Sequence, residues 1–217
     1  MRFMRLLSII TLISLTILGC SNTGTQNKAS DVLFSDDFSN SNKKWDQVSN
    51  SSALADYYNA AFRIMVYATS FNAWANPGNE SFVDTRIEVD AAKNSGPDDN
   101  EFGVICRYVD ASWFYFAAIS SDGYYAIMKM TGTGTVPIGN ASMLESDTIS
   151  HGAASYHIRF DCVGSTLTLF VNGSLVDEQT DSDYITGNVG LLAGTFGTPG
   201  TDILFDNFFV YKPVADE

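Results

Sequence analysis

Acidic side chains that alternate along one segment are the first candidates for chemistry. Arg86, Glu88 and Asp90 are separated by apolar residues, which is the pattern of a β-strand. Side chains two positions apart on a strand point to the same face of the sheet. Two carboxylates on one face can flank a glycosidic bond, one as nucleophile and one as acid/base. The alternative is that these residues form a solvated strand face.

Other catalytic motifs are missing from the sequence. It contains no Gly-x-Ser-x-Gly nucleophile elbow, no His-Glu-x-x-His zinc site and no Gly-x-x-x-x-Gly-Lys phosphate loop. His151 and His157 have no Cys or second His nearby in the sequence to complete a metal set, and we expect His157 on the surface of a strand. The motifs therefore assign no catalytic residue.

Aromatic residues offer more for binding. Residues 113–116 and 124–125 flank a turn and are aromatic on both strand faces. Because a sandwich strand has one core face, a loop or a ligand must cover the other. Flat rings edged by Asn, Asp and Arg suit sugars, whose C–H faces are apolar and whose hydroxyls need fixed partners. The predicted ligand-binding residues are Trp74, Trp113, Tyr125 and Arg107; the alternative is that they serve packing.

These residues must be positioned by strands. After the N-terminal segment no stretch sustains a 3.6-residue apolar period, and short runs of β-branched and aromatic residues alternate with turn residues. The predicted strands are 32–38, 53–58, 61–67, 82–91, 102–108, 114–120, 124–130, 154–163, 166–171, 174–177, 187–195 and 202–211. This pattern predicts an all-β sandwich or barrel. The Asp122-Gly123 pair predicts a two-residue type I′ turn, which would set Phe116 opposite Lys129 and make the Phe116 face the wetter one.

Three segments then carry a resemblance. Residues 158–173 (IRFDCVGSTLTLFVNG), 187–191 (GNVGL) and 205–208 (FDNF) resemble the concanavalin A-like and laminin G-like jelly-roll domains, with Asp36-Asp37-Phe38 and Trp45 extending the match. These include domains labelled 3-keto-disaccharide hydrolase-like or related to family 16 glycoside hydrolases. The resemblance implies a two-sheet antiparallel jelly-roll β-sandwich. It specifies activity weakly, because its motifs are signatures of a fold.

The same resemblance tests the acidic strand. Family 16 glucanases carry a third carboxylate after Glu-x-Asp, and here Ala92 and Lys93 occupy its places. Without that proton donor, two-step hydrolysis is incomplete. We therefore interpret Glu88 and Asp90 as a solvated face and favour a non-catalytic, carbohydrate-binding domain. The alternatives are a divergent glycoside-active hydrolase and a structural or sensory domain that contacts another envelope protein.

Two cysteines beyond the N-terminal segment predict a disulfide. Cys106 shares the apolar parity of Phe102 and Val104, and Cys162 shares that of Phe160. Both should lie inside the sandwich in an oxidising compartment, where they can pair. Two separately buried thiols are the alternative.

A structural calcium ion is also expected. Jelly rolls that resemble this domain commonly set their terminal strands side by side, which would bring Asp37 and Asp206 together as carboxylate ligands. The acidic loop with Asp98, Asp99 and Glu101 is an alternative second site. The competing interpretation is that these carboxylates are solvated or bind backbone donors.

The N-terminal segment predicts export and lipid attachment. Arg2 and Arg5 precede an uncharged apolar run, residues 6–18, that is too short to span a bilayer. The run ends at Ile17-Leu18-Gly19-Cys20, which resembles the bacterial lipobox, so Cys20 would carry acyl chains such as palmitate. In a Gram-negative cell Ser21 would resemble an outer-membrane sorting signal. We therefore expect an extracytoplasmic protein anchored in the cell envelope.

The sequence predicts four consecutive segments. Residues 1–19 form the predicted signal peptide, 20–31 the lipidated Cys and a polar tether, 32–213 a single domain and 214–217 a tail. The net charge is −13, and loss of Arg2 and Arg5 with the signal peptide makes it about −15. Such a surface repels nucleic acid and anionic lipid headgroups. The sequence leaves the oligomeric state open.

Replacing Cys20 tests the anchor. Cys20→Ser removes the thiol that accepts the lipid, so we expect an unprocessed or mislocalised precursor. Cell fractionation and mass spectrometry of the mature N-terminus measure this. Unchanged fractionation, with no acyl mass on the wild-type N-terminus, would contradict the assignment.

Overall fold

The structure is a computed structural model, and it describes residues 31–153 and 155–213. The predicted signal peptide, the lipidated Cys20, the tether up to residue 30 and the tail 214–217 lie outside the described residues. Among the residues it describes, no helix is long and apolar enough to cross a membrane.

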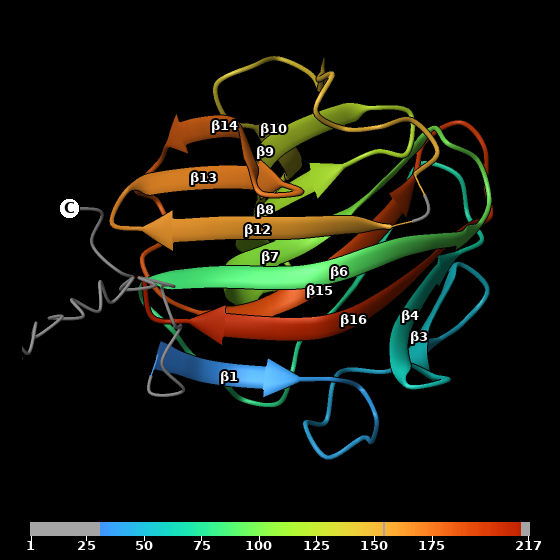
Figure 1. The fold of residues 1–217 in the computed structure, drawn as a ribbon, viewed down its shortest axis with the longest axis horizontal. Coiled ribbons are helices and arrows are strands. Elements are labelled where there is room, and N and C mark those ends of the chain that lie inside the picture. Colours follow the sequence, from blue (N-terminus) through green and yellow to red (C-terminus); the bar gives the residue numbers. More distant parts are fainter. Residues whose placement is uncertain (1–30, 154, 214–217) are drawn as a thin grey trace, which may run out of the picture.

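Two antiparallel sheets pack as a jelly-roll sandwich (Figure 1). The larger sheet has the order β14-β13-β12-β6-β16-β4-β3-β2, with β1 also paired to β16. Its strands are β1 (Val32–Asp36), β2 (Val48–Ser49), β3 (Ala53–Tyr58), β4 (Ala61–Val66), β6 (Thr85–Ser95), β12 (Tyr156–Val163), β13 (Thr166–Val171), β14 (Ser174–Thr180) and β16 (Thr201–Tyr211). The fold prediction is confirmed.

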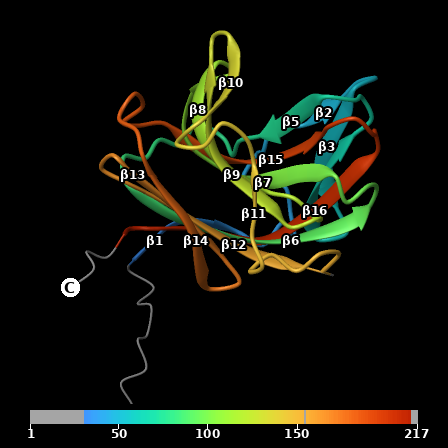
Figure 2. The same cartoon turned by 90° about the horizontal axis from the view of Figure 1, so that it is seen from above.

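The smaller sheet has the order β10-β9-β8-β7-β15-β5, with β11 paired to β9. Its strands are β5 (Phe71–Ala75), β7 (Asn100–Asp110), β8 (Trp113–Ile119), β9 (Tyr124–Thr131), β10 (Gly134–Pro137), β11 (Leu144–Glu145) and β15 (Asn188–Thr195). This sheet is curved, with β10 rising on one side and β5 on the other (Figure 2).

Most strand predictions agree with these bounds, but β2, β5, β10 and β11 are not among the predicted strands. No strand is predicted around Trp74, where Asn and Pro-Gly are turn residues, yet Phe71–Ala75 pairs with β15 as an edge strand. An edge strand needs partners on one side only, so its sequence signal is weak. Residues 82–84 precede β6 instead of beginning it, because Phe82 pairs with Gly187 in an isolated bridge.

The predicted pairing of the β8–β9 hairpin was wrong by one residue. Phe116 lies opposite Met128, and Tyr115 takes the place opposite Lys129. The turn has three residues, since Ser120 N donates to Tyr124 O at 2.8 Å and Gly123 adopts a φ of 96°. A third turn residue shifts the register, so Phe116 packs in an apolar cluster and its face is not the wetter one.

The main core lies between the sheets and is rich in aromatic rings. Trp45 packs against Phe38 edge-on and against Phe62 at a tilt, with centroid distances of 5.3 Å each, and its indole Nε1 donates to Asp36 Oδ2 at 2.9 Å. Asp36 also accepts a hydrogen bond from the backbone of Phe38. The buried carboxylate therefore fixes the segment after β1 against the core, because a buried indole N–H needs an acceptor.

The predicted disulfide is confirmed. Cys106 on β7 is bonded to Cys162 on β12, with Cα atoms 6.7 Å apart. The bond joins the two sheets through the core, and it closes a sequence separation of 56 residues. The chain-entropy model gives such a loop on the order of 4 kcal/mol of stabilisation.

Removing both cysteines tests that contribution. The Cys106→Ala, Cys162→Ala variant should lose on the order of 4 kcal/mol of unfolding free energy, because its unfolded chain is no longer cross-linked. Urea denaturation measures the loss, and wild-type protein unfolded in excess reductant should behave like the variant. Coincident midpoints for oxidised wild type and the variant would refute a stabilising role.

Candidate functional site

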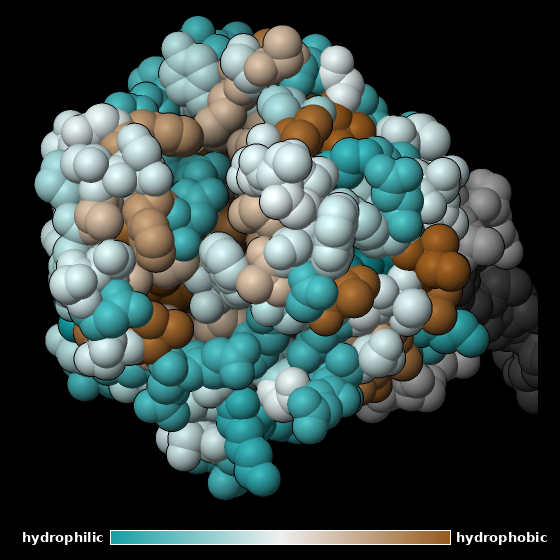
Figure 3. Space-filling view, turned by 180° about the vertical axis from the view of Figure 1, so that it is seen from behind, coloured by the Kyte–Doolittle hydropathy of each residue, from teal (hydrophilic) through white to brown (hydrophobic). Residues whose placement is uncertain are grey.

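The outer face of the smaller sheet carries a second apolar cluster, separate from the main core. Side chains alternate along β7, so Val104 and Cys106 face the core while Ile105 faces outward. The buried members of this outer cluster are Ile105, Phe114, Phe116, Ala118, Ala126, Met128 and Leu192. Figure 3 views this side of the molecule and shows a hollowed face with hydrophobic atoms in the hollow. These residues are themselves buried, and the accessible surface of the face belongs to the partly exposed side chains packed against them, Trp74, Tyr108, Met130 and Met143.

Aromatic rings form one part of the outer cluster. Phe114 lies at the centre, with ring centroids 5.5 Å from Trp74 and 5.3 Å from Tyr108. Phe114 is fully buried, whereas Trp74 and Tyr108 are partly exposed. Partly exposed rings over a buried ring offer flat apolar surface to a ligand. Trp74, predicted from sequence as a ligand-binding residue, therefore lies on this face.

A buried carboxyl lies on the same face, near the start of β7. Glu101 is only 4% exposed, and Gly194 of β15 lies between Glu101 and Asn72 of β5. A Cβ at Gly194 would lie 2.2 Å from Asn72 Oδ1 and 2.8 Å from Glu101 Cγ. Glycine at this position therefore leaves room for both polar side chains. Burial raises the pKa of Glu101 to about 7, and the hydrogen bond with Asn72 opposes that rise.

A hollow of about 410 Å³ adjoins these residues, and we call it the polar hollow. It is lined by Asp99, Ser120, Asp122, Tyr124, Ser142, Met143 and Phe196. Met143 also packs against the outer cluster, which connects the hollow to the aromatic part. Hydroxyl and carboxyl groups thus lie beside apolar rings, which is the combination that sugar recognition requires.

The structure does not bring the predicted aromatic platform together. Trp113 begins β8 on the same strand face as Tyr115, with its ring centroid 6.2 Å from that of Tyr184. Tyr125 packs against the main core and lies opposite Leu144. Both therefore point away from the face that carries Trp74. Side chains alternate along β8 and β9, so Trp113 lies on the opposite strand face from Phe114, and Tyr125 on the opposite face from Ala126.

Arg107 is buried and holds loops together. It is 2% exposed, and it donates to the backbone oxygens of Val83 at 3.1 Å and Tyr184 at 2.9 Å. Its guanidinium also pairs with Asp84 at 3.3 Å. Arg107 adopts a φ of 52° where the pairing of β7 with β8 shifts register. These partners lie in two loops, so the arginine is engaged in packing and does not reach Trp74.

Glu88 and Asp90 lie on the outer face of the larger sheet, away from the outer cluster. Asp90 Oδ1 lies 2.8 Å from His157 Nδ1, and Glu88 Oε2 lies 3.8 Å from Nε2 of the same ring. The nearby carboxylates of Glu88 and Asp90 favour the charged imidazolium and raise the pKa of His157 to about 9. The pair is therefore more than a solvated face, because a histidine on the adjacent strand joins the two carboxylates. Sequence separation concealed this contact.

The geometry at the predicted calcium ligands is mixed. The terminal strands β1 and β16 do pair, with Asp36 opposite Phe208. Asp37 accepts hydrogen bonds from Ser39, and Asp206 accepts one from Asn207 N at 2.7 Å. In the alternative loop, Asp98 pairs with Lys93, Asp99 lines the polar hollow, and Glu101 is buried beside Asn72. In residues 31–153 and 155–213, no group of three or more His, Cys, Asp or Glu could hold a metal ion. Calcium binding stays a prediction, which thermal melts in calcium and in chelator can test.

Comparison with solved structures places the chain among jelly-roll folds of the concanavalin A-like type. A carbohydrate-binding module, CBM66 from Bacillus subtilis, matches with a TM-score of 0.63 and 16% identity, covering 77% of this chain and 95% of its own. A Bacillus licheniformis β-glucanase matches with a TM-score of 0.60 and 10% identity, covering 83% of this chain and 98% of its own. A protein of unknown function with a galectin-like fold from Bacillus subtilis matches with a TM-score of 0.60 and 11% identity, covering 86% of this chain and 98% of its own. No protein-family model and no curated protein sequence matches the chain. Identities this low show the fold alone.

The buried carboxyl of Glu101 predicts a pH dependence of stability. The folded protein keeps a proton with a pKa of about 7 that the unfolded chain releases near 4.5. The contribution of Glu101 to the unfolding free energy is therefore most favourable below pH 4.5 and falls as pH rises toward 7, by up to about 3 kcal/mol. Glu101→Gln cannot ionise, so it should match wild type at pH 4 and exceed its stability at pH 8. Urea denaturation at both pH values measures this; parallel profiles would show that Glu101 ionises normally.

Proposed function

We propose that this protein is a lipid-anchored, carbohydrate-binding protein of the bacterial cell envelope, and that the outer face of the smaller sheet binds the glycan. The observation that carries the proposal is the placement of Trp74 and Tyr108 over Phe114, with Glu101 and the polar hollow on the same face. Rings would contact the apolar C–H face of a sugar, and the polar groups would bind its hydroxyls.

The fold and the charge support this assignment. Similar solved structures include a carbohydrate-binding module and a β-glucanase. The acidic chain, with a net charge of −13, disfavours nucleic acid as a ligand. A neutral glycan has no such repulsion to overcome, so stacking and hydrogen bonding can provide the affinity.

A single substitution separates this face from the other aromatic residues. Trp74→Ala should weaken glycan binding at least tenfold, because it removes a stacking ring that is partly exposed. Trp113→Ala is the matched control, since Trp113 lies on the other strand face and should leave affinity unchanged. A glycan array identifies the ligand and calorimetry measures both variants. Loss of binding in Trp113→Ala alone would move the site away from this face.

A second candidate function is hydrolysis of a glycoside. The observation that favours it is Glu101, a buried carboxyl whose pKa burial raises to about 7, so that part of the population keeps the proton that a general acid donates near neutral pH. Under this alternative, Glu101→Gln abolishes release of reducing sugar and keeps binding. Binding by wild type without any product release would leave the non-catalytic function.

A further inference from the structure

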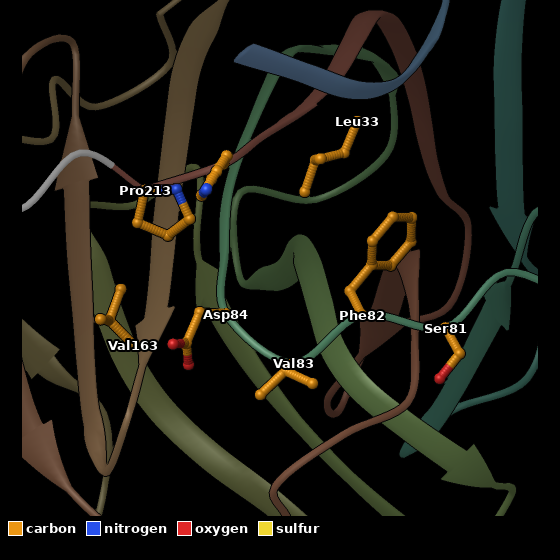
Figure 4. Close-up of a pocket in the computed structure, with 8 residues that line it drawn as sticks. Leu33, Ser81, Phe82, Val83, Asp84, Val163 and Pro213 are labelled. Atoms are coloured by element: carbon orange, nitrogen blue, oxygen red, sulfur yellow. The ribbon is translucent and has the colours of Figure 1, made fainter.

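An apolar hollow of about 590 Å³ lies at the end of the sandwich where the described chain begins and ends, and we call it the terminal hollow (Figure 4). It is lined by Leu33, Ser81, Phe82, Val83, Asp84, Val163, Lys212 and Pro213. Leu33 is the third described residue, and Pro213 is the last. The hollow is therefore next to both chain ends and separate from the outer cluster around Trp74.

An exposed aliphatic side chain of its lining, Val83, has two further exposed aliphatic residues on segments that contact the Phe82–Val83 segment. Val83 is 60% exposed, Ile185 67% and Val109 59%. The bridge between Phe82 and Gly187 sets the segments of Val83 and Ile185 side by side, and Arg107, two residues before Val109, donates to Val83 O. Single exposed aliphatic residues are ordinary, but a group beside an apolar hollow indicates a contact surface.

The length of the chain outside the described part indicates what covers this surface. Ten residues, 21–30, separate Cys20 from Asp31, and a segment of that length spans at most about 35 Å. A lipid on Cys20 would hold Asp31, near the terminal hollow, within that distance of the bilayer. Tethering at this range gives a high effective concentration, so a weak apolar surface is enough for contact.

We propose that this end of the sandwich rests on the lipid bilayer, with Val83, Ile185 and the rim of the terminal hollow in the headgroup region. The inference depends on the lipid attachment at Cys20 proposed above. Contact would be apolar, because the acidic chain is not attracted to anionic headgroups. Trp113 begins the strand after Val109 and is 42% exposed at the same end, where a tryptophan suits the membrane interface.

A site-specific probe on the full lipidated chain tests this contact. Val83→Cys carries an environment-sensitive fluorophore, and the chain is reconstituted into phosphatidylcholine vesicles that contain brominated lipid. The matched control is Leu175→Cys, since Leu175 is 58% exposed and follows the Asn172-Gly173 turn, at the opposite end of the β12–β13 hairpin from Val163. We expect at least threefold stronger quenching at position 83 than at position 175. Ile185→Asp added to the Val83→Cys chain should reduce that quenching, and so should added phosphatidylglycerol.

Three outcomes would overturn the inference. Equal quenching at positions 83 and 175, on a chain whose N-terminus shows acyl mass, refutes the contact and leaves the anchor intact. A chain without acyl mass refutes the anchor, and the contact with it. Protection of the position 83 probe in the absence of vesicles, together with a dimer in sedimentation, would assign the surface to a second copy of the chain.

Discussion

The smaller sheet carries large apolar side chains on both of its faces, while a two-layer sandwich has its core on only one of them. Tyr115 and Ala117 join the main core, and Phe114, Phe116 and Ala118 on the same strand form the outer cluster. In the part of the chain that the structure describes, no further sheet or helix covers that outer face; the partly exposed side chains of Trp74, Tyr108, Met130 and Met143 pack over its buried residues. Its exposed aromatic edges, and with them the candidate binding site, follow from this imbalance.

The remaining structure serves to keep this sheet fixed against the larger one. The Cys106–Cys162 bond crosses the core between β7 and β12, so the strand that carries Glu101 cannot slide relative to the larger sheet. Beyond the bond, Arg107 uses its buried guanidinium to hold the loops at Val83 and Tyr184. A buried cation satisfied mainly by backbone oxygens is costly to displace, because its donors would be left unpaired. The position of the terminal hollow therefore depends on Arg107, which the sequence analysis predicted to be a ligand-binding residue.

Local pattern was enough to predict an all-β sandwich or barrel, the family resemblance narrowed this to a jelly roll, and prediction failed where contacts are distant in sequence. The hairpin over residues 158–173 and the parity of the two cysteines follow from alternation within single strands, so both predictions were correct. The β8–β9 register was wrong because Asp122-Gly123 is part of a three-residue turn that composition does not distinguish from a two-residue one. Arg107 was wrongly predicted to bind a ligand. The residues that it contacts, Val83 and Tyr184, lie 24 and 77 positions away in the sequence, and no local pattern indicates such contacts. Glu101 was assigned only to an acidic loop, although it directly precedes the predicted strand 102–108. Phe102 and Ile105 have opposite parity in that strand, which indicates a strand with two apolar faces.

The direction of β7 relates the two proposed surfaces. Glu101 lies near the start of this strand, beside the polar groups of the candidate glycan site, and Val109 lies near its end, beside the terminal hollow. Eight residues separate them, which corresponds to at most about 26 Å, because the backbone departs from the extended form at Arg107. If the end near Val109 rests on the bilayer, the strand holds Glu101 that distance further from the lipid. The outer face of the smaller sheet would then lie parallel to the membrane normal, with its surface accessible to solvent. Glycan binding and membrane contact would therefore use different surfaces.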